Sequence, residues 1–398
     1  MGKRILLVNK FYYRRGGDCV CVLNLERLLR RNGHEVAIFA MNYSENEPTQ
    51  WSRYFAPNVT FQGGAAEKIK MLKRTLGFDN LNDSFKKLLD DFRPDVVHFH
   101  NIHSYLSPSL VKTAKQHGAT VAWTLHDYKL LCPSYLCLRN GKPCEKCLSH
   151  PINVLTHRCM KDSLPASAIA WMESMRWNRK YIQRWVDTFI SPSRFLADLM
   201  KKGKFDPDKI TVLPNFLDMN GETTRAITPA AQREDYYCYV GRLSEEKGVR
   251  TLLKVAATLD REIRIAGDGP LLDELKERYN GYSTIKFLGR IGADEVTTLL
   301  GNARFSVVPS EWYENNPLSV IESLCAGTPA VGAEIGGIPE LINDNNGVTF
   351  RPGDESELAQ AINSAWWGPW DHQLISDEAH EEFSDLKYYA NICKIYRL

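Results

Sequence analysis

Short apolar runs alternate with helix-length segments twice along this chain of 398 residues. Apolar runs bounded by amphipathic segments are typical of parallel sheets covered by helices on both faces. The first set of expected strands comprises residues 4–9, 35–39, 95–100, 120–125 and 188–191, and the second comprises 236–240, 262–266, 284–288, 305–308 and 330–332. We therefore expect an α/β chain with two doubly wound domains.

The domain boundary is expected in the stretch 214–235, which contains Pro, Asn and Thr and has no clear period. A chain of this length favours two domains over one. The expected parts are a first Rossmann-like domain (1–213), a second (214–380) and a final aromatic-rich helix (381–398) that packs back on the first. If the two domains face a central cleft, ligands would bind there, beyond the carboxyl ends of the strands.

Charge is divided unevenly between the two halves. Residues 1–215 hold 33 Lys and Arg against 19 Asp and Glu, and the remainder holds 17 against 29, so that +14 and −12 sum to the net charge of +2. The basic half suits an anionic partner or surface, including a membrane, although the two halves could instead attract each other across a cleft.

Targeting signals are not evident in the sequence. The first apolar run, Ile5–Val8, is too short for a signal peptide, and no apolar run approaches the roughly 18 residues of a spanning helix. The segment after Met1 also lacks the pattern for myristoylation. We expect a cytoplasmic protein, with reduced thiols, that acts in the cytoplasm or at the inner face of the membrane.

Two carboxylates, Glu314 and Glu322, stand eight positions apart around an expected short helix, 317–326. Asn315 and Asn316 are good N-cap types and Pro317 suits the first helical position. Free amides at such a start favour anions, which makes the segment that includes Leu318 and Ser319 a candidate phosphate site. Carboxylates beside an anion site indicate a ligand that carries both phosphate and hydroxyl groups.

The run Gly241–Gly248 follows an expected strand and opens a helix. Its Arg242 and Lys247 suit a diphosphate, and Gly241 lets the backbone approach a ligand closely. A capped helix with solvated surface charges is the alternative. The glycine turns at Gly16-Gly17 and Gly267 are weaker indications. The first does not fit a complete nucleotide-binding motif, and the second can be a plain turn between a strand and a helix.

A histidine, His126, ends an expected strand of the first domain, where it can bind a sugar hydroxyl or a phosphate or make a strand-end hydrogen bond. Mid-strand His98 is expected to be a core histidine whose hydrogen bonds are satisfied.

Five of the ten cysteines fall within 132–159. Cys144 and Cys147 have the spacing of half a zinc knuckle, and Cys132 and Cys159 flank them symmetrically. These four predict a structural zinc site, with disulfides or free thiols as the alternatives.

Two basic segments, 65–76 and 171–185, place cations beside apolar residues, as interfacial helices do. Ordinary amphipathic core helices have the same pattern. No nucleic-acid-binding module is recognised, so no nucleic-acid partner is expected.

The order of these motifs resembles glycosyltransferase family 4, whose fold is GT-B. The resemblance rests on the Gly16-Gly17 loop, His98-x-His100-Asn101, His126-Asp127, the Gly241–Gly248 run, Gly267-Asp-Gly-Pro270 and Glu314-x7-Glu322. It implies a retaining transfer from a UDP- or GDP-sugar to a saccharide or lipid-linked acceptor, with no cofactor required for the chemistry.

The resemblance also implies roles for single residues. Glu322 would bind the nucleotide ribose, Glu314 the sugar hydroxyls, and Arg242 with Lys247 the diphosphate. Gly17 would lie near the donor, His126 near the sugar, and Arg290 near the base. The residues expected to take part in the chemistry are Glu314, His126, Arg242 and Lys247. The residues expected to bind the donor also include Gly16, Gly241, Gly267, Asn316, Leu318 and Ser319.

One departure separates this chain from the usual family pattern. Asn315-Asn316-Pro317 replaces Gly-Phe-Gly after the first glutamate, and Pro317 lacks an N–H. A similar pattern in surface-polysaccharide branches places the chain there. A sugar-nucleotide epimerase of the GT-B fold and a non-catalytic nucleotide-sugar binding protein are the alternatives.

Overall fold

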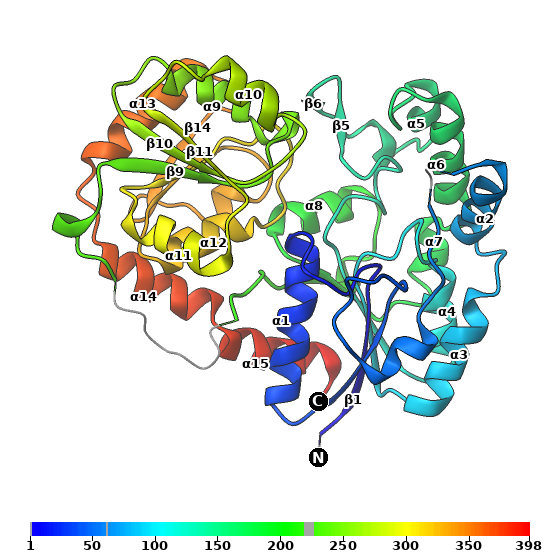
Figure 1. Ribbon diagram of the computed structural model, residues 1–398. Helices are drawn as coiled ribbons and strands as arrows, with labels where there is room; N and C mark the ends of the chain where they lie inside the picture. The colour runs from blue at the N-terminus through cyan, green and yellow to red at the C-terminus, as the bar shows by residue number, and fades with distance from the viewer. Residues whose placement is uncertain (1, 61–62, 219–226) are drawn as a thin grey trace. The chain divides into compact units, whose positions relative to one another are not determined.

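The computed structural model describes residues 2–60, 63–218 and 227–398, so part of the expected linker lies outside the described residues. The chain forms two compact units (Figure 1). The first contains Met1–Cys137, Cys144–Pro214 and Tyr388–Leu398, and the second contains Leu138–Pro143 and Asn215–Lys387.

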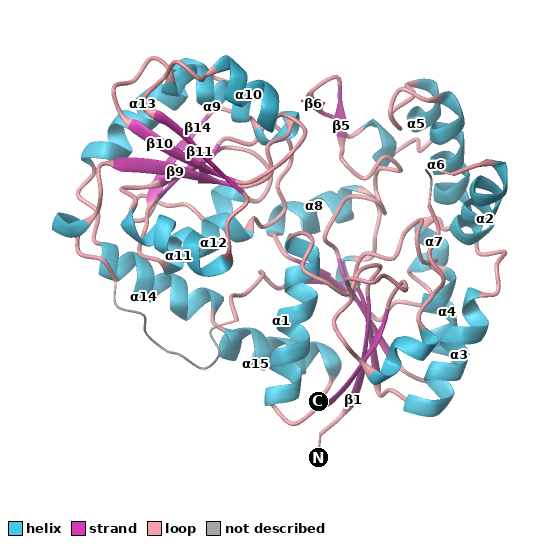
Figure 2. Cartoon of the chain, viewed as in Figure 1, coloured by secondary structure: helices cyan, strands magenta, loops and turns pink. Residues whose placement is uncertain are grey.

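The first unit is built on a six-stranded sheet in the order β2-β1-β3-β4-β7-β8, in which every neighbouring pair is parallel. Helices accompany the sheet (Figure 2). The strands are β1 (Arg4–Val8), β2 (Glu35–Phe39), β3 (Val96–Phe99), β4 (Thr120–Thr124), β7 (Thr188–Ser191) and β8 (Ile210–Val212). The helices are α1 (Gly17–Arg31), α2 (Ala65–Leu76), α3 (Leu81–Phe92), α4 (Ser109–Gln116), α5 (Asn153–Thr156), α6 (Leu164–Arg176), α7 (Arg179–Ile182) and α8 (Arg194–Lys202).

Strand β1 shows why the sequence pattern is a good guide here. Ile5–Val8 are fully buried, because a central parallel strand has helices over both of its faces. The following helix, α1, ends where Gly33 takes a positive φ of 79° and its N–H donates to the carbonyl of Arg30.

A hairpin of β5 (Leu138–Arg139) and β6 (Lys142–Pro143) is antiparallel and lies outside both large sheets.

The second unit has a six-stranded parallel sheet in the order β11-β10-β9-β12-β13-β14. Its strands are β9 (Tyr236–Val240), β10 (Glu262–Ala266), β11 (Ile285–Gly289), β12 (Ser306–Val308), β13 (Ala330–Ala333) and β14 (Gly347–Phe350). Its helices are α9 (Val249–Ala256), α10 (Leu272–Arg278), α11 (Ala293–Asn302), α12 (Leu318–Cys325), α13 (Glu355–Trp367) and α14 (His372–Phe383). The α/β architecture expected from the sequence is confirmed.

Two short elements of this unit are not among those expected from the sequence. The 3₁₀ turn Ile338–Glu340 follows a pair of glycines, and Pro339 lies in its first turn, where a missing N–H costs no hydrogen bond. Strand β14 was not expected, since Gly347–Phe350 follows a polar turn and is too short to show a period.

The last helix, α15 (Asp385–Tyr396), returns the chain to the first unit, which it joins from Tyr388 onward. The hydroxyl of Tyr396 lies 2.7 Å from Nδ1 of His98, and the hydroxyl of Tyr389 lies 2.8 Å from Nε2 of His34. Within the part of the chain that the structure describes, no helix is both long and apolar enough to cross a bilayer.

Candidate active site

Two loops of the second unit lie where its strand order reverses, between β9 and β12. Strands β9 and β12 are neighbours although nearly seventy residues separate them. The loop after β9 carries Arg242 and Lys247, and the loop after β12 carries Glu314. Both loops leave the carboxyl ends of parallel strands, which is where ligands bind in sheets of this type.

Lys247 and Glu314 form a direct ion pair across these loops. The Lys247 Nζ lies 2.6 Å from Oε1 of Glu314, and this same oxygen accepts hydrogen bonds from the Ser310 hydroxyl at 2.7 Å and the Trp312 indole at 3.0 Å. The Lys247 ammonium also lies over the Trp312 ring, 5.2 Å from its centroid. Glu314 is only 7% exposed, so three donors hold a buried carboxylate in one orientation.

The electrostatics of this cluster keep Glu314 ionised. Burial acts to raise the pKa of its carboxyl, but the charge and hydrogen bond of Lys247 outweigh burial, and the pKa lies below its usual value. An ionised carboxylate accepts hydrogen bonds and has no proton to give. Glu314 is therefore suited to hold hydroxyl groups rather than to act as a general acid.

Two glycines allow neighbouring backbone segments to pack closely against the loop that carries Glu314. Gly336 has a φ of +62°, and a Cβ there would lie 2.1 Å from the carbonyl oxygen of Glu314. The N–H of Gly337 donates to that carbonyl at 2.7 Å. Gly248, with a φ of +66°, sits against the Pro309 carbonyl in the same way. The site geometry thus requires glycine at Gly248 and Gly336.

The turns after β9, β10 and β11 lie against each other. The N–H of Gly241 donates to Ala266 at 3.0 Å, and that of Gly267 donates to Gly289 at 2.7 Å. A Cβ at Gly267, whose φ is +143°, would lie 1.8 Å from the Gly241 carbonyl oxygen. Arg242 and Arg290 follow two of these turns, and their side chains are exposed. The structure therefore places both arginines at the same edge of the sheet as Lys247.

Helix α12 begins one residue later than expected, and its cap differs from the sequence prediction. Pro317 occupies the N-cap position and no side chain caps the helix. Asn316 is buried and instead engages Asn215, whose N–H donates to Asn316 Oδ1 at 2.8 Å and whose side-chain amide donates to Asn316 O at 2.9 Å. Asn316 thus joins α12 to the chain that enters the second unit, while the predicted donor contacts of Leu318 and Ser319 would use the first-turn amides.

Glu322 lies one turn inside α12 and differs electrostatically from Glu314. Burial raises the pKa of its carboxyl to about 7. Among the described residues, its side chain has no hydrogen-bonding partner. A half-buried carboxylate without a protein partner at this edge of the sheet is suited to accept hydrogen bonds from a ligand.

The first unit gathers polar groups at the carboxyl ends of β1, β3 and β4. The N–H of Asn101 donates to Asn9 at 3.1 Å, and its side-chain amide donates to Asp18 at 2.5 Å. His126 Nε2 lies 2.9 Å from His100 Nδ1, and their rings are stacked. The pKa of Asp18 is lowered because the charges of Lys10 and His126 outweigh its burial.

Burial lowers the pKa of His126, while the nearby Asp18 and Asp127 act in the opposite direction. Its neighbour His100 is buried, and its Nε2 has no hydrogen-bonding partner among the described residues. Gly16 precedes α1 as its N-cap residue and Gly17 is the first helical residue, so both predicted glycines lie where β1 passes into α1, next to Asp18. His98 is a core histidine, as expected, and hydrogen-bonds Tyr396 and Thr124.

Three cysteines of the 132–159 segment lie together, and two of them, Cys132 and Cys147, are among the four predicted zinc ligands. Hydrogen bonds from Cys137 and Cys147 lower the pKa of the Cys132 thiol, so these three sulfurs lie together. Cys137 was not among the expected ligands, whereas Cys144 and Cys159 are only partly buried. Within the described residues, no group of three or more His, Cys, Asp or Glu side chains is arranged to hold a metal ion. The zinc site stays a prediction.

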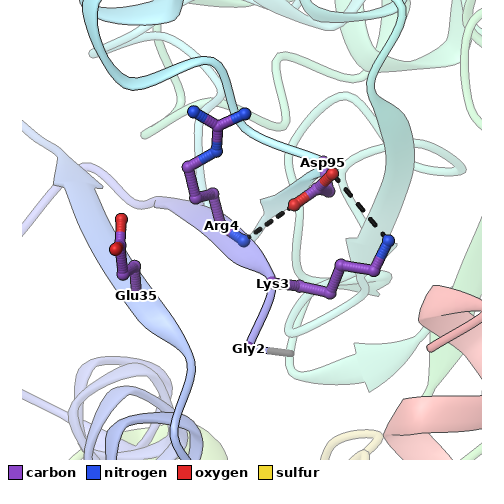
Figure 3. A pocket seen from close by; sticks show the side chains of 5 residues that line it. All are labelled: Gly2, Lys3, Arg4, Glu35 and Asp95. Carbon is purple, nitrogen blue, oxygen red and sulfur yellow. Dashed lines mark hydrogen bonds and ion pairs between the residues drawn. The ribbon is translucent and has the colours of Figure 1, made fainter.

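A hollow of about 440 Å³ lies at the amino ends of the strands in the first sheet, opposite to the ends that carry His126 and Asn101 (Figure 3). It is lined by Gly2, Lys3, Arg4, Glu35 and Asp95. The Arg4 N–H donates to Asp95 at 2.8 Å, and the Lys3 ammonium lies 3.9 Å from the same carboxylate. It lies at the amino ends of the strands, away from the carboxyl ends where ligands bind in such sheets, and its Asp95 carboxylate already has two partners, so we assign it no role in the chemistry.

Several residues of the two clusters were not found from the sequence. Ser310, Trp312 and Asn215 act through contacts that depend on how loops fold, and Ser and Asn are common in any loop. Asp18 did offer a signal, since it follows the Gly16-Gly17 loop directly and is the only acidic residue in the first turn of α1.

Two family models match the chain. The model described as Glycosyltransferase Family 4 matches residues 15–220, and the model described as Glycosyl transferases group 1 matches residues 220–379. Together they cover both units.

Curated relatives include the sulfoquinovosyl transferase SQD2 of Arabidopsis thaliana, which is 26% identical over 266 residues, or 63% of this chain and 52% of that protein. A glycogen synthase of Mycobacterium tuberculosis is 34% identical over 165 residues, or 39% of each chain. This chain therefore spans about half or less of these two relatives. An uncharacterized 42.6 kDa protein in the cps region of Klebsiella pneumoniae is 24% identical over 353 residues, covering 85% of this chain and 87% of that protein.

Solved structures share the fold over almost the whole chain. The sucrose-phosphate synthase of Thermosynechococcus elongatus superposes with a TM-score of 0.72 at 18% identity, covering 99% of this chain and 98% of that one. Anabaena Alr3699/HepE in complex with UDP-glucose superposes with a TM-score of 0.65 at 16% identity, with 98% of each chain covered. At this identity the similarity shows the fold alone, which is GT-B.

Proposed function

This chain belongs to glycosyltransferase family 4, and on that premise we propose that it transfers a sugar, with retention of configuration, from a nucleotide-diphosphate sugar to a saccharide or lipid-linked saccharide in the synthesis of a surface polysaccharide. The observation that carries the proposal is the ion pair of Lys247 and Glu314, in the loops where the strand order of the second sheet reverses. A cation for phosphate and an ionised acceptor for hydroxyls stand side by side there.

Lys247 can serve the diphosphate without leaving Glu314. An ammonium has three donors, and one of them is used by the Glu314 carboxylate. The side chain is a quarter exposed, which leaves the remaining donors open to a ligand. With the exposed guanidinium of Arg242, it would stabilise negative charge as the nucleotide diphosphate departs.

The remaining roles follow from the state of each group. Glu314 would accept hydrogen bonds from sugar hydroxyls. Glu322, to which no described residue donates a hydrogen bond, would accept them from the ribose. His126 in the first unit would bind a sugar hydroxyl as a neutral imidazole. The acceptor hydroxyl attacks the anomeric carbon from the face of the leaving group, the bond to the diphosphate breaks, and an oxygen of the departing phosphate takes the acceptor proton.

A family relative supports the polysaccharide role. The Klebsiella pneumoniae protein that matches most of this chain is named for its place in a cps region. The structure that superposes at a TM-score of 0.65 is a complex with UDP-glucose, which makes UDP-sugars the first donors to test.

A donor panel tests the proposal most directly. Purified protein is incubated with UDP- and GDP-sugars, and slow hydrolysis of each nucleotide-sugar is measured with and without saccharide acceptors. The variant Arg242→Ala should lose turnover at least a hundredfold, since one charged hydrogen-bond donor to a transition state is worth about 3 kcal/mol. Lys254→Ala is the control, because Lys254 pairs with Glu355 on the surface.

Unchanged turnover in Arg242→Ala would refute the assignment. Conversion of the donor alone into an isomeric nucleotide-sugar would instead identify an epimerase. Binding of nucleotide-sugars without hydrolysis or transfer to any acceptor would identify a binding protein.

A further inference from the structure

Helix α6 buries two polar residues and exposes three large apolar ones. Its inner face contains Ser167, Ala170 and Glu173, which are fully or almost fully buried. Its outer face contains Leu164, Met172 and Met175, which are 49%, 37% and 53% exposed. A helix that only covers a protein core shows the reverse arrangement. An ordinary amphipathic core helix, which was the alternative for the overlapping segment 171–185, therefore does not explain the exposed apolar residues of α6.

The buried polar groups of α6 explain its orientation. The Glu173 carboxylate pairs with Lys129 at 2.8 Å and accepts a hydrogen bond from the N–H of Ser104 at 3.1 Å. Ser167 accepts a hydrogen bond from the N–H of Met160 at 3.0 Å. These contacts fix which side of the helix faces inward, so Leu164, Met172 and Met175 are held outward by the fold.

Helix α2 presents a second apolar residue among cations. Ile69 is 56% exposed, at the centre of the outer side of the helix. Lys68, Lys70 and Lys73 surround it and are exposed. The opposite side of α2 is buried through Met71, Arg74 and Thr75. An exposed apolar residue with lysines beside it can insert at a membrane interface while the lysines meet the headgroups.

The two helices are joined into one surface. The Trp177 indole donates to the carbonyl of Thr75 at 2.8 Å, which ties the end of α6 to the end of α2. The Arg176 guanidinium lies 5.8 Å from the ring centroid of Phe78, which is 66% exposed. Figure 1 shows α2 and α6 next to each other, and their backbones are in contact. We call this surface the α2–α6 face; its apolar members are Ile69, Phe78, Leu164, Met172 and Met175.

The charge of the α2–α6 face is strongly positive. The exposed cations on and beside the two helices are Lys68, Lys70, Lys73, Arg158, Lys161 and Arg176. Acidic groups there are the exposed Asp162 and the half-exposed Glu67, which leaves a net charge of +4 from the six cations and two acids. An apolar patch with a cationic border matches an anionic lipid surface, in which headgroups neutralise the border and acyl chains receive the apolar residues.

We propose that the α2–α6 face docks the first unit on an anionic phospholipid membrane, with Ile69, Phe78, Leu164 and Met175 inserted at the level of the headgroups. Docking needs neither donor nor acceptor and stands apart from the sugar-transfer chemistry. It would hold the protein at a surface where lipid-linked acceptors are found.

Vesicle sedimentation with the full chain tests the proposal. Binding is measured to vesicles of phosphatidylcholine alone and with 30% phosphatidylglycerol, at low and at high salt. We expect binding to the anionic vesicles only, weakened by salt. Each lysine near such a surface contributes about fivefold in partitioning, so Lys70→Gln with Lys73→Gln should bind about 25-fold more weakly.

Matched variants separate docking from general charge. Lys86 and Lys87 are exposed lysines on α3 of the same unit, and their double Gln variant should bind as the parent does. Leu164→Ser with Met175→Ser should lower binding, including the part that survives high salt. Donor hydrolysis should stay unchanged in all of these variants. If the parent hydrolyses no donor but still binds anionic vesicles, the proposed function is refuted and docking is not.

Three outcomes would overturn docking. They are no binding to anionic vesicles, an equal loss in the α3 control, and self-association in solution that Leu164→Ser with Met175→Ser abolishes. The last would show that a second copy of the chain covers this face.

Discussion

Replacing Lys247 by Met should destabilise the second unit through the carboxylate that it leaves behind. Met keeps most of the apolar volume of the lysine stem and removes only the ammonium. The Glu314 carboxylate would then be buried with two neutral donors, Ser310 and Trp312. Removing one partner of a fully buried pair costs about 3–5 kcal/mol. Because Lys247 is 25% exposed and two donors remain, we expect a cost at or below the lower end of this range, about 2–3 kcal/mol.

The cost should depend on pH in a defined direction. In the parent, Lys247 holds the pKa of Glu314 below its usual value, so the pair stabilises the fold above the unfolded-state pKa and this contribution is lost as pH falls through the folded-state value. Without Lys247, burial dominates and raises the pKa of Glu314. The variant is then penalised as pH rises through that raised value, so the difference in the free energy of unfolding should grow from pH 5 to pH 7.5.

Urea unfolding of the parent, Lys247→Met, Glu314→Gln and the double variant measures this cost. Glu314→Gln leaves a lysine that can reach water, so it should cost less than Lys247→Met, and the double variant should be more stable than the sum of the single costs predicts. Lys254→Met provides a surface control, with a change within about 0.5 kcal/mol. Additive single costs, or a cost for Lys247→Met that is equal at pH 5 and pH 7.5, would refute this account of the cluster.

Three further predictions concern other parts of the molecule. Glu322→Gln should make the unfolding free energy less dependent on pH, because burial raises the pKa of Glu322 to about 7 and its stabilising effect is therefore lost as pH rises through that value; unfolding curves from pH 5 to pH 8 that match the parent would contradict this. Gly336→Ala should cost about 1–3 kcal/mol and reduce turnover, since its φ is +62° and a Cβ would meet the Glu314 backbone at 2.1 Å; Gly281→Ala, where a Cβ meets nothing within 4 Å, is the control for thermal unfolding. Protein purified under reducing conditions should contain about one zinc per chain, lost in Cys147→Ser, if the cysteine spacing is interpreted correctly; metal-free protein by elemental analysis would rule the site out.

The sequence by itself determined the α/β class and most strands of both sheets. Ile5–Val8 and Tyr236–Val240 were recognisable because a strand buried on both faces needs a continuous apolar run. Glu314, Lys247 and Arg242 were also recognisable, since residue types suited to phosphates and hydroxyls follow strand ends in a fixed order. The family that this order resembles is confirmed by the model that matches residues 15–220.

Only the tertiary structure decided how these residues act. The sequence could not show that Lys247 and Glu314, 67 positions apart, share a hydrogen bond, or that Asn316 bonds Asn215 rather than capping α12. Nor could it show that α6 faces outward with its apolar side, because periodicity gives a stripe but not the direction in which it points. Local sequence sets backbone preference over a few residues, whereas pairing, burial and orientation depend on segments that only folding brings together.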